Sequence, residues 1–416
     1  MGEMASKNET TAVGLDISTS KVVCLVGITQ PDSPNLSVVG IGVAPSSGLR
    51  KGVVVDIEET VTAITSALEE AERMSGVVIE RATVSVDGSH IQSLNSRGVI
   101  AVSRADKQIS REDMDRASEA AAALSLETNR EILRVIPRTY IVDGQSNIND
   151  PFGMSGVRLE IDTHILTASI PAMKNLDDSI HRAGITTNGH VIAPLASARA
   201  CLTKRQKELG VAVVDIGAET TGIAIFEEGR VSFSSIIPIG SNHITKDIVY
   251  GLRTTIDIAE KLKTQFGAAR KSSIKNTTKL DLTKIGAKGS LMERELDLII
   301  CSRLEEIAGL IKTEITRSGK ERLLSNGIVL TGGGAKLPNI ETFLEAEITL
   351  PVMIGEPIGI TGIIDRVKDP AFSTAVGLLF EDMDRPQNGS SVNDRIGQIF
   401  TGVQGFIRGL TGRKNF

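Results

Sequence analysis

The sequence predicts a two-domain α/β fold built on a duplicated core. The first observation is a repeat, because Val13–Asp16, a polar turn and Val22–Val26 have the same order as Val211–Asp215, a polar turn and Ile223–Phe226. The second is length, since 416 residues exceed one ordinary core. The third is composition: 40 glycines with 41% apolar and 23% charged residues are typical of a globular chain with many turns and α/β crossovers.

The N-terminal part predicts a strand meander followed by a helix and another strand. Val13–Leu15 and Val22–Gly27 flank a polar turn, and Leu36–Val43 continues the pattern. Ile57–Met74 has apolar residues at the helix period between a capping Asp56 and Gly76. A strand follows at Arg81–Val86.

An insert with elements of its own is expected between this strand and about Ile170. Its pattern predicts a strand at Gly98–Ser103, an alanine-rich helix at Arg111–Leu126, and strands at Glu131–Val142 and Leu159–Ile170. These elements suffice for a small separate lobe.

After the second hairpin the sequence predicts three helices, a strand and a terminal linker. The helices are His243–Gly251, Thr255–Phe266 and Leu291–Thr316. The strand Gly327–Leu330 then leads into Thr331–Gly334, and Ala335–Pro338 is expected to open a helix. Glu381–Asp394 is rich in Asp, Asn, Ser and Gly, which is typical of a flexible linker.

Composition argues against several classes of function. A net charge of −5 and the lack of alternating aromatic and basic residues disfavour nucleic-acid binding. The three cysteines are far apart and lie in or beside apolar runs, as expected of reduced thiols in a cytoplasm. No signal peptide or run of eighteen apolar residues occurs, and the five histidines lack metal-ligand spacing.

Both hairpin turns of the repeat are candidates for binding phosphate. Gly14–Lys21 and Asp215–Gly222 each end an apolar strand with a carboxylate, Asp16 or Asp215, and turn tightly with small residues. Such turns direct backbone N–H groups at an anion. Two facing turns would hold phosphates between them, with both aspartates near a Mg²⁺ ion that keeps several waters. Either turn alone is better explained as an ordinary hairpin with a solvated aspartate.

Thr331-Gly332-Gly333-Gly334 follows a strand, and its glycines let the backbone approach a ligand closely. A triple glycine alone is weak evidence. The chain contains no G-x-x-x-x-G-K-[ST] motif, and the triplet lacks the G-x-G-x-x-G order, so neither a P-loop nor a Rossmann site is supported.

Together the two aspartate turns and the late glycine triplet resemble the phosphate and adenosine motifs of the superfamily of actin, sugar kinases and heat-shock chaperones. The chain is most similar to one branch, the FtsA family of bacterial cell-division proteins, and the similarity includes an insert at about 84–168 placed where that family has its extra subdomain. The matching stretches cover nearly the whole chain: Val13–Gly27, Ser47–Glu58, Ser85–Ser103, Leu133–Asp143, Pro151–Ala168, Gly210–Phe226, Gly327–Ile340 and Ile358–Phe380.

The resemblance implies an actin-like α/β fold with ATP and Mg²⁺ in a cleft, and Asp16 and Asp215 holding the Mg²⁺ through water. Asp215 is also the candidate for orienting a water in a slow hydrolysis. Adenosine would pack on Gly332, Gly333 and Gly334, and Glu260 and Lys263 would meet ribose and base, although a solvated helix face explains those two equally well. The expected phosphate contacts are Ser18, Thr19, Lys21, Gly217, Ala218 and Thr220.

One residue departs from the family pattern. Ser18 stands where the family usually has glycine. Serine does not readily adopt a positive φ, so the departure is expected to affect phosphate affinity rather than the fold.

The resemblance also implies a domain plan in which the first core is interrupted by the FtsA-specific insert and the second core by a lobe that binds the tubulin-like protein FtsZ. The expected segments are 12–83, 169–195 and 365–380 for the first core, 84–168 for the insert, 196–242 and 327–364 for the second core, 243–326 for the FtsZ-binding lobe, 381–394 for the linker and 395–416 for a membrane-targeting helix.

By the same resemblance the protein would polymerise, bind the FtsZ C-terminal peptide and attach FtsZ to the cytoplasmic face of the membrane at the septum, where later division proteins join. A basic run in the lobe is expected to attract the acidic peptide: Arg270, Lys271, Lys275, Lys279, Lys284 and Lys288. A PilM-like pilus-assembly protein and a sugar or acetate kinase remain as rivals. No substrate-binding residues stand out beyond the nucleotide motifs, which disfavours a kinase. PilM-like proteins lack such a C-terminal tail.

That tail, Arg395–Phe416, predicts an amphipathic helix that binds an anionic membrane surface. Its apolar residues recur at intervals of three and four and fall on one face. Arginines flank that face, where their stems can snorkel toward lipid phosphates. The apolar residues are Ile396, Ile399, Phe400, Val403, Phe406, Ile407 and Leu410, and the principal flanking arginines are Arg408 and Arg413.

Overall fold

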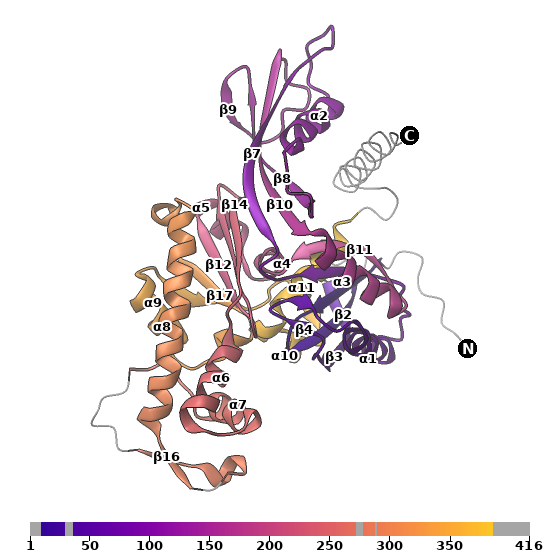
Figure 1. Cartoon of the computed structure of the whole chain (residues 1–416). Coiled ribbons are helices and arrows are strands. Elements are labelled where there is room, and N and C mark those ends of the chain that lie inside the picture. The colour runs from indigo at the N-terminus through magenta and orange to yellow at the C-terminus, as the bar shows by residue number, and fades with distance from the viewer. Residues whose placement is uncertain (1–9, 30–35, 272–277, 288, 386–416) are drawn as a thin grey trace, which may run out of the picture. The chain divides into compact units, whose positions relative to one another are not determined.

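The computed structural model describes residues 10–29, 36–271, 278–287 and 289–385. The chain forms two compact units (Figure 1). The larger consists of the described residues of Met1–Ser89, Lys174–Arg230 and Ser234–Met383, and the smaller of those of His90–Met173, Val231–Phe233 and Asp384–Phe416.

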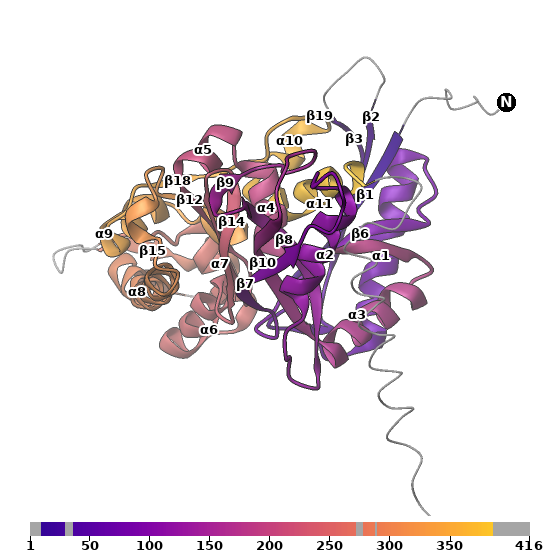
Figure 2. The same cartoon turned by 90° about the horizontal axis from the view of Figure 1, so that it is seen from above.

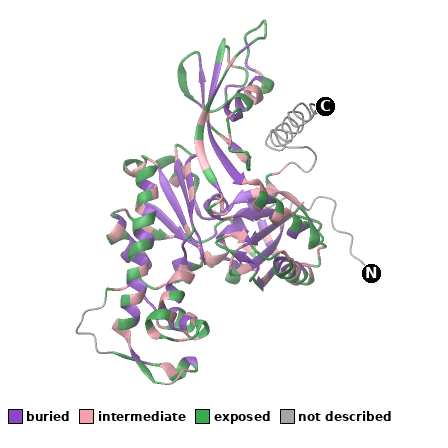
Figure 3. Ribbon diagram, in the orientation of Figure 1, coloured by how far each residue is buried: buried purple, intermediate pink, exposed green. Residues whose placement is uncertain are grey.

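The first sheet of the larger unit contains the predicted meander. β1 (Thr10–Ile17), β2 (Lys21–Thr29) and β3 (Leu36–Pro45) pair antiparallel in chain order. The strands are mostly buried because layers of helix cover them, which explains their nearly continuous apolar sequences (Figure 3). Parallel partners complete the sheet order β11-β6-β1-β2-β3-β19, namely β6 (Arg81–Val86), β11 (Thr186–Ile192) and β19 (Ile360–Gly362).

Helix α1 (Ile57–Ser75) confirms the strongest local prediction. The Asp56 side chain accepts a hydrogen bond from the Glu59 N–H at its start, and Gly76 ends it in the left-handed conformation. Its apolar face packs on β2 and β3. Two short strands precede it, β4 (Leu49–Arg50) and β5 (Val53–Val54), and α3 (Ile170–Arg182) leads into β11.

The second sheet repeats the first and confirms the predicted duplication. β12 (Val211–Ile216) and β13 (Thr221–Glu227) form an antiparallel hairpin like that of β1 and β2, and β17 (Ile328–Thr331) lies parallel to β12 as β6 does to β1. β14 (Arg230–Ile237) and β18 (Val352–Ile354) complete the order β14-β13-β12-β17-β18. The larger unit is thus an actin-like α/β fold.

Two helices cross in the middle of the larger unit, where Figure 2 shows them side by side. α4 (Ala193–Cys201) contacts β12, and α11 (Ser373–Met383) contacts β1, so the pair joins the two sheets. A Cβ on Gly377 would lie 1.8 Å from the Ala196 carbonyl oxygen, so only glycine permits this crossing. Because α11 extends to Met383, residues 381–383 are helical, and the linker expected from Glu381 begins too early.

The three helices predicted after the second hairpin are confirmed as α6 (Ser241–Leu252), α7 (Ile256–Gln265) and α8 (Glu293–Arg317). The predicted start of the next helix at Ala335 is wrong. Residues 333–336 form a 3₁₀ turn, and α9 begins at Ile340, after Pro338. The remaining elements are α5 (Lys204–Leu209), β15 (Lys279–Asp281), η1 (Leu282–Ile285), β16 (Ser290–Met292), η2 (Glu321–Leu323), η3 (Gly333–Lys336), α9 (Ile340–Ile348), α10 (Ile364–Val367) and η4 (Pro370–Phe372).

The smaller unit is a sheet of order β7-β10-β8-β9 with one helix packed on it. Its predicted elements are present with shifted ends. The helix stops at Ala122 instead of Leu126, and the first strand begins six residues earlier, at Gln92. β9 was not predicted. The bounds are β7 (Gln92–Ala101), α2 (Arg111–Ala122), β8 (Arg130–Val142), β9 (Gln145–Ile148) and β10 (Arg158–Ser169).

Candidate functional site

A pocket opens where the two hairpin turns, the glycine segment and the start of α11 meet in the larger unit. Its empty volume, the open mouth included, is about 600 Å³. The structure brings nine of the predicted residues to its lining: Asp16, Ser18, Thr19, Asp215, Gly217, Ala218, Thr220, Gly332 and Gly333. Other lining residues include Asp87, Ala193, Pro370, Ala371 and Thr374.

The first turn accommodates Ser18 without strain. The Ser18 N–H donates to the Lys21 carbonyl at 3.1 Å, and its hydroxyl donates to the same oxygen at 2.9 Å. Ser18 is not among the non-glycine residues with positive φ. The matching turn of the second half closes in the same way, with the Gly217 N–H 2.9 Å from the Thr220 carbonyl. Serine is therefore compatible with the backbone of this turn.

The second turn is tied down by helix α6. The N–H groups of Ser241 and Asn242, at the start of α6, donate to the carbonyls of Gly217 and Ala218 at 2.9 and 2.7 Å. The Lys51 N–H and the Lys246 ammonium bind the Glu219 carboxylate at 3.0 and 2.6 Å, which fixes the tip of the turn.

Each glycine of the triplet plays a different structural part. Gly332 has φ +86°, and a Cβ there would lie 2.2 Å from Asp215 Oδ1. Gly334 is packed on Ile216, which would lie 2.4 Å from an added Cβ. Gly333 has no atom within 4 Å of the place of a Cβ, so a side chain there would enter open space at the pocket. Of the three glycines, Gly332 is the one with a positive φ.

Three carboxylates line the pocket, one more than the sequence indicated. Burial raises the pKa of Asp16 to about 7, against a hydrogen bond with Ser85, and the charges of Asp215 and Asp87 raise it further. Burial likewise raises the pKa of Asp87 to about 6, although a hydrogen bond from Thr220 opposes it, and burial raises the pKa of Asp215. Acids with raised pKa values that crowd together in a cleft are typical of functional sites.

Asp87 was missed because its sequence context is unremarkable. It follows β6, which pairs parallel to β1, and the ends of parallel neighbours meet at one sheet edge. The order of the strands in the sheet was therefore the signal. Asp87 directly follows Arg81–Val86 and lies at the same sheet edge as Asp16, which comes just before the turn after β1.

Comparison with known proteins identifies the chain's relatives. A family model for the cell division protein FtsA matches residues 212–377, and a model for the SHS2 domain inserted in FtsA matches residues 88–167. The cell division protein FtsA of Pseudomonas aeruginosa is 39% identical over 92% of this chain and 91% of its own length. That of Neisseria meningitidis is 40% identical over 92% and 94%.

The chain belongs to the FtsA family of cell division proteins. The residues matched by the SHS2 model form most of the described part of the smaller unit. This match confirms the predicted fold class and its insert. In the part of the chain that the structure describes, no helix is long and apolar enough to cross a bilayer.

Solved structures of other families share the fold of this FtsA chain. The PilM protein of a PilM–PilN type IV pilus biogenesis complex has a TM-score of 0.66 at 14% identity, covering 90% of this chain and 99% of that one. MreB5 of Spiroplasma citri bound to ADP gives 0.52 at 14% identity over 90% and 96%. A MamK double helical filament gives 0.53 at 13% identity over 90% and 99%. At such identities the likeness concerns fold alone, so the PilM alternative gains nothing against the FtsA relatives.

Lys21 lies beside the pocket of this FtsA chain, outside its lining. Its ammonium donates to the Ala371 carbonyl at 3.1 Å and lies 4.2 Å from the centre of the Phe372 ring. Burial lowers its pKa, and the charges of Asp16 and Asp369 oppose that change. The side chain is thus held at the pocket rim by the loop before α11.

Glu260 and Lys263 are not brought to the pocket lining. The Lys263 ammonium lies 2.8 Å from Glu260 and 2.7 Å from the Thr245 hydroxyl, which in turn donates to Glu260 at 2.6 Å. This cluster joins α7 to α6, one turn beyond the residues that hold the second hairpin turn. Their predicted contacts with ribose and base stay predictions.

Proposed function

We propose that this chain is an ATP-binding, self-assembling cell-division protein that attaches FtsZ filaments to the cytoplasmic face of the membrane at the septum and recruits later division proteins. The observation that carries the proposal is the pocket, in which both duplicated aspartate turns and the glycine segment converge within a chain of the FtsA family. Filament formation rests on the family resemblance.

The lining suits a nucleotide with Mg²⁺. No group of three or more His, Cys, Asp or Glu side chains among the described residues is arranged to hold a metal directly. Mg²⁺ commonly keeps several waters and binds one or two carboxylates together with substrate phosphates, and Asp16 and Asp215 provide such carboxylates. Ser18, Thr19 and the turn 217–220 would hold phosphates, and adenosine would pack on Gly332 and Gly333. Bound Mg²⁺ would supply the positive charge that three carboxylates and a triphosphate require.

Calorimetric titration with ATP, with and without Mg²⁺, tests this site. The proposal expects saturable one-to-one binding that strengthens with Mg²⁺. If the protein binds neither form at millimolar concentration, the pocket is not a nucleotide site. Hydrolysis, with Asp215 orienting the attacking water, is a separate question that a phosphate-release assay decides.

The lobe 243–326 is the proposed docking surface for the FtsZ C-terminal peptide. Among the described residues of this lobe, the three most exposed large apolar side chains are Tyr250 at 81%, Leu298 at 69% and Ile256 at 54%. Gly251 of α6 packs against Ile299 of α8. Tyr250 and Leu298 directly precede these two residues in sequence, so they lie next to this contact between the helices. An exposed aromatic with aliphatic neighbours is typical of a peptide-binding surface.

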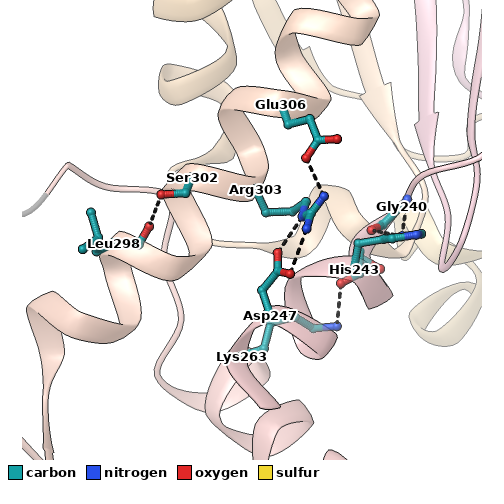
Figure 4. A network of polar contacts seen from close by, with 9 residues as sticks. Gly240, His243, Asp247, Lys263, Leu298, Ser302, Arg303 and Glu306 are labelled. Carbon is teal, nitrogen blue, oxygen red and sulfur yellow. Dashed lines mark hydrogen bonds and ion pairs between the residues drawn. The ribbon is translucent and has the colours of Figure 1, made fainter. Parts of the chain in front are cut away.

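A polar network fixes these helices relative to one another (Figure 4). Arg303 of α8 makes a bidentate pair with Asp247 of α6, at 2.5 and 2.8 Å, and also binds Glu306. The Leu298 carbonyl accepts the Ser302 hydroxyl at 2.9 Å, while the Leu298 side chain points away from the network. Bidentate guanidinium pairs are geometrically specific, so this one holds the surface in place.

The proposed basic run contributes less to this surface than its sequence indicates. Arg270 binds Glu293 and Asp297, and Lys271 binds Glu305 and Glu347. These two charges are paired within the fold, whereas Lys279 and Lys284 are exposed. Lys275 and Lys288 lie outside them.

We expect the double variant Tyr250→Ser and Leu298→Ser to bind the FtsZ C-terminal peptide at least tenfold more weakly, about 1.4 kcal/mol, because both side chains lose their apolar contacts. Fluorescence anisotropy with a labelled peptide measures the affinity. Val78→Ser is the matched control, since Val78 is 79% exposed and lies between α1 and β6. Equal affinity of the double variant and wild type would remove this surface from the interface.

The membrane anchor falls on the tail, residues 395–416, which lies outside the described residues. We expect the double variant Phe400→Glu and Phe406→Glu to be released from anionic liposomes, because two charges would enter the apolar face. Flotation measures the bound fraction, and ATP affinity serves as the control for an intact fold. Continued flotation of the variant would refute the anchor. Several tails in one filament would bind together, so assembly would strengthen attachment.

A further inference from the structure

The Asp215 carboxylate is held by two hydroxyl groups from other elements of the fold. Ser197 Oγ donates to Asp215 Oδ2, and Thr374 Oγ1 donates to the same oxygen at 3.0 Å. The two hydroxyl oxygens are themselves 2.9 Å apart. Three polar side chains from β12, α4 and α11 therefore meet at one carboxylate oxygen.

Burial makes this arrangement specific. Ser197 is fully buried and Thr374 is only 8% exposed, so water competes little for these two hydroxyl groups. Each hydroxyl has one proton to donate, and an ionised carboxylate is the strongest acceptor nearby. Both protons are thus directed at Oδ2, which fixes the rotation of the carboxylate about its Cβ–Cγ bond.

The other oxygen, Oδ1, stays free for a ligand. Among the described residues none donates a hydrogen bond to it, and Gly332, which lines the same pocket, has no side chain to cover it. A Cβ at Gly332 would lie 2.2 Å from Oδ1. The site thus presents one carboxylate oxygen toward the pocket and anchors the other behind it.

We propose that Ser197 and Thr374 are positioning residues that orient Asp215, so that its Oδ1 receives a water of the Mg²⁺–nucleotide complex. The proposal rests on the proposed nucleotide function of the pocket. Groups that hydrogen-bond to a metal site's carboxylate from outside typically change metal affinity 10- to 100-fold when removed. Because the two hydroxyls come from the crossing helices α4 and α11, the packing of those helices sets the orientation of Asp215.

The test is a double-mutant cycle on Mg²⁺–ATP affinity. Ser197→Ala and Thr374→Val each remove a hydroxyl while nearly preserving volume, and each is expected to weaken Mg²⁺–ATP binding about tenfold. In an Asp215→Asn background the same substitutions should change the affinity less than twofold, because the carboxylate they orient is gone. Calorimetry gives the strong affinities, and the rise in melting temperature with millimolar Mg²⁺–ATP gives the weak ones.

Conservative variants separate positioning from packing. Thr374→Ser keeps the hydroxyl and loses a methyl group, so we expect it to retain affinity within about threefold of wild type, unlike Thr374→Val. A tenfold loss by Ser197→Ala that persists in the Asp215→Asn background would overturn the proposal, because the residue would then act through the fold. Unchanged affinity in the single variants would overturn it as well. A wild-type protein that binds no ATP would instead overturn the proposed function itself.

Discussion

Replacing Gly333 with valine should weaken ATP binding at least about a hundredfold, equivalent to roughly 2.7 kcal/mol, while the fold stays intact. Gly333 lines the pocket, lies in a 3₁₀ turn without positive φ, and has no atom within 4 Å of the place of a Cβ. A branched side chain would therefore meet no protein atom and would occupy the space proposed for adenosine. Calorimetry with Mg²⁺–ATP measures the loss, and thermal unfolding without nucleotide checks the fold.

Two other glycines give the controls for this experiment. Gly309 in α8 also has open space at its Cβ, so Gly309→Val should leave ATP affinity unchanged. Gly332→Val should lower stability as well as affinity, since its φ is +86° and its Cβ would meet Asp215. Unchanged ATP affinity in Gly333→Val would show that adenosine does not pack on this segment.

The second large effect concerns the charge of Asp87 in the nucleotide-free protein. Its folded pKa of about 6 lies above the ordinary value of 3.8, so between these pH values the folded protein holds more protons than the unfolded chain. Stability contributed by this group is therefore complete below pH 4 and is lost as pH rises through 6. Asp87→Asn has no carboxyl group to titrate at this position. We therefore expect the stability of this variant relative to wild type to increase by about 3 kcal/mol between pH 4 and a pH above 6.

Urea unfolding of both proteins from pH 4 to 8 measures this difference. Comparing variants is necessary because His90 and His164, whose burial lowers their pKa to about 4, oppose the trend in the absolute stability. Asp178→Asn, at an exposed carboxylate, is the control substitution. Parallel curves for Asp87→Asn and wild type would contradict the raised pKa.

Local signals explain why much of the fold was predictable. Asp56 and Gly76 define the ends of α1 by capping, and apolar runs on either side of a polar turn define both hairpins. Their repetition predicted the duplicated core, and family resemblance then added the insert. β9 was missed because its local signal was weak. The end of α2 was placed too late because its alanine-rich sequence favours helix beyond the last packed turn.

The candidate site was predictable to the extent that its motifs are contiguous in sequence. Taken together, the two turns and the glycine segment predicted a site for phosphate and for close backbone approach to a ligand. Nine of the residues predicted in this way line the pocket. Pairing within the fold was not visible: Arg270 and Lys271 belong to a basic run in sequence, yet each is matched by two acids from distant helices.

The duplicated α/β core, the FtsA family and the aspartate turns could be predicted from the amino-acid order, because each depends on residues that are neighbours along the chain. Three features required the folded structure: Asp87 joins Asp16 and Asp215, Gly332 rather than Gly333 has the positive φ, and Ser197 and Thr374 hold one oxygen of Asp215. Ser197 and Thr374 are 177 residues apart, and they meet because α4 and α11 cross where Gly377 lacks a side chain. Contacts of this kind follow from helix packing and sheet order, which no local pattern contains.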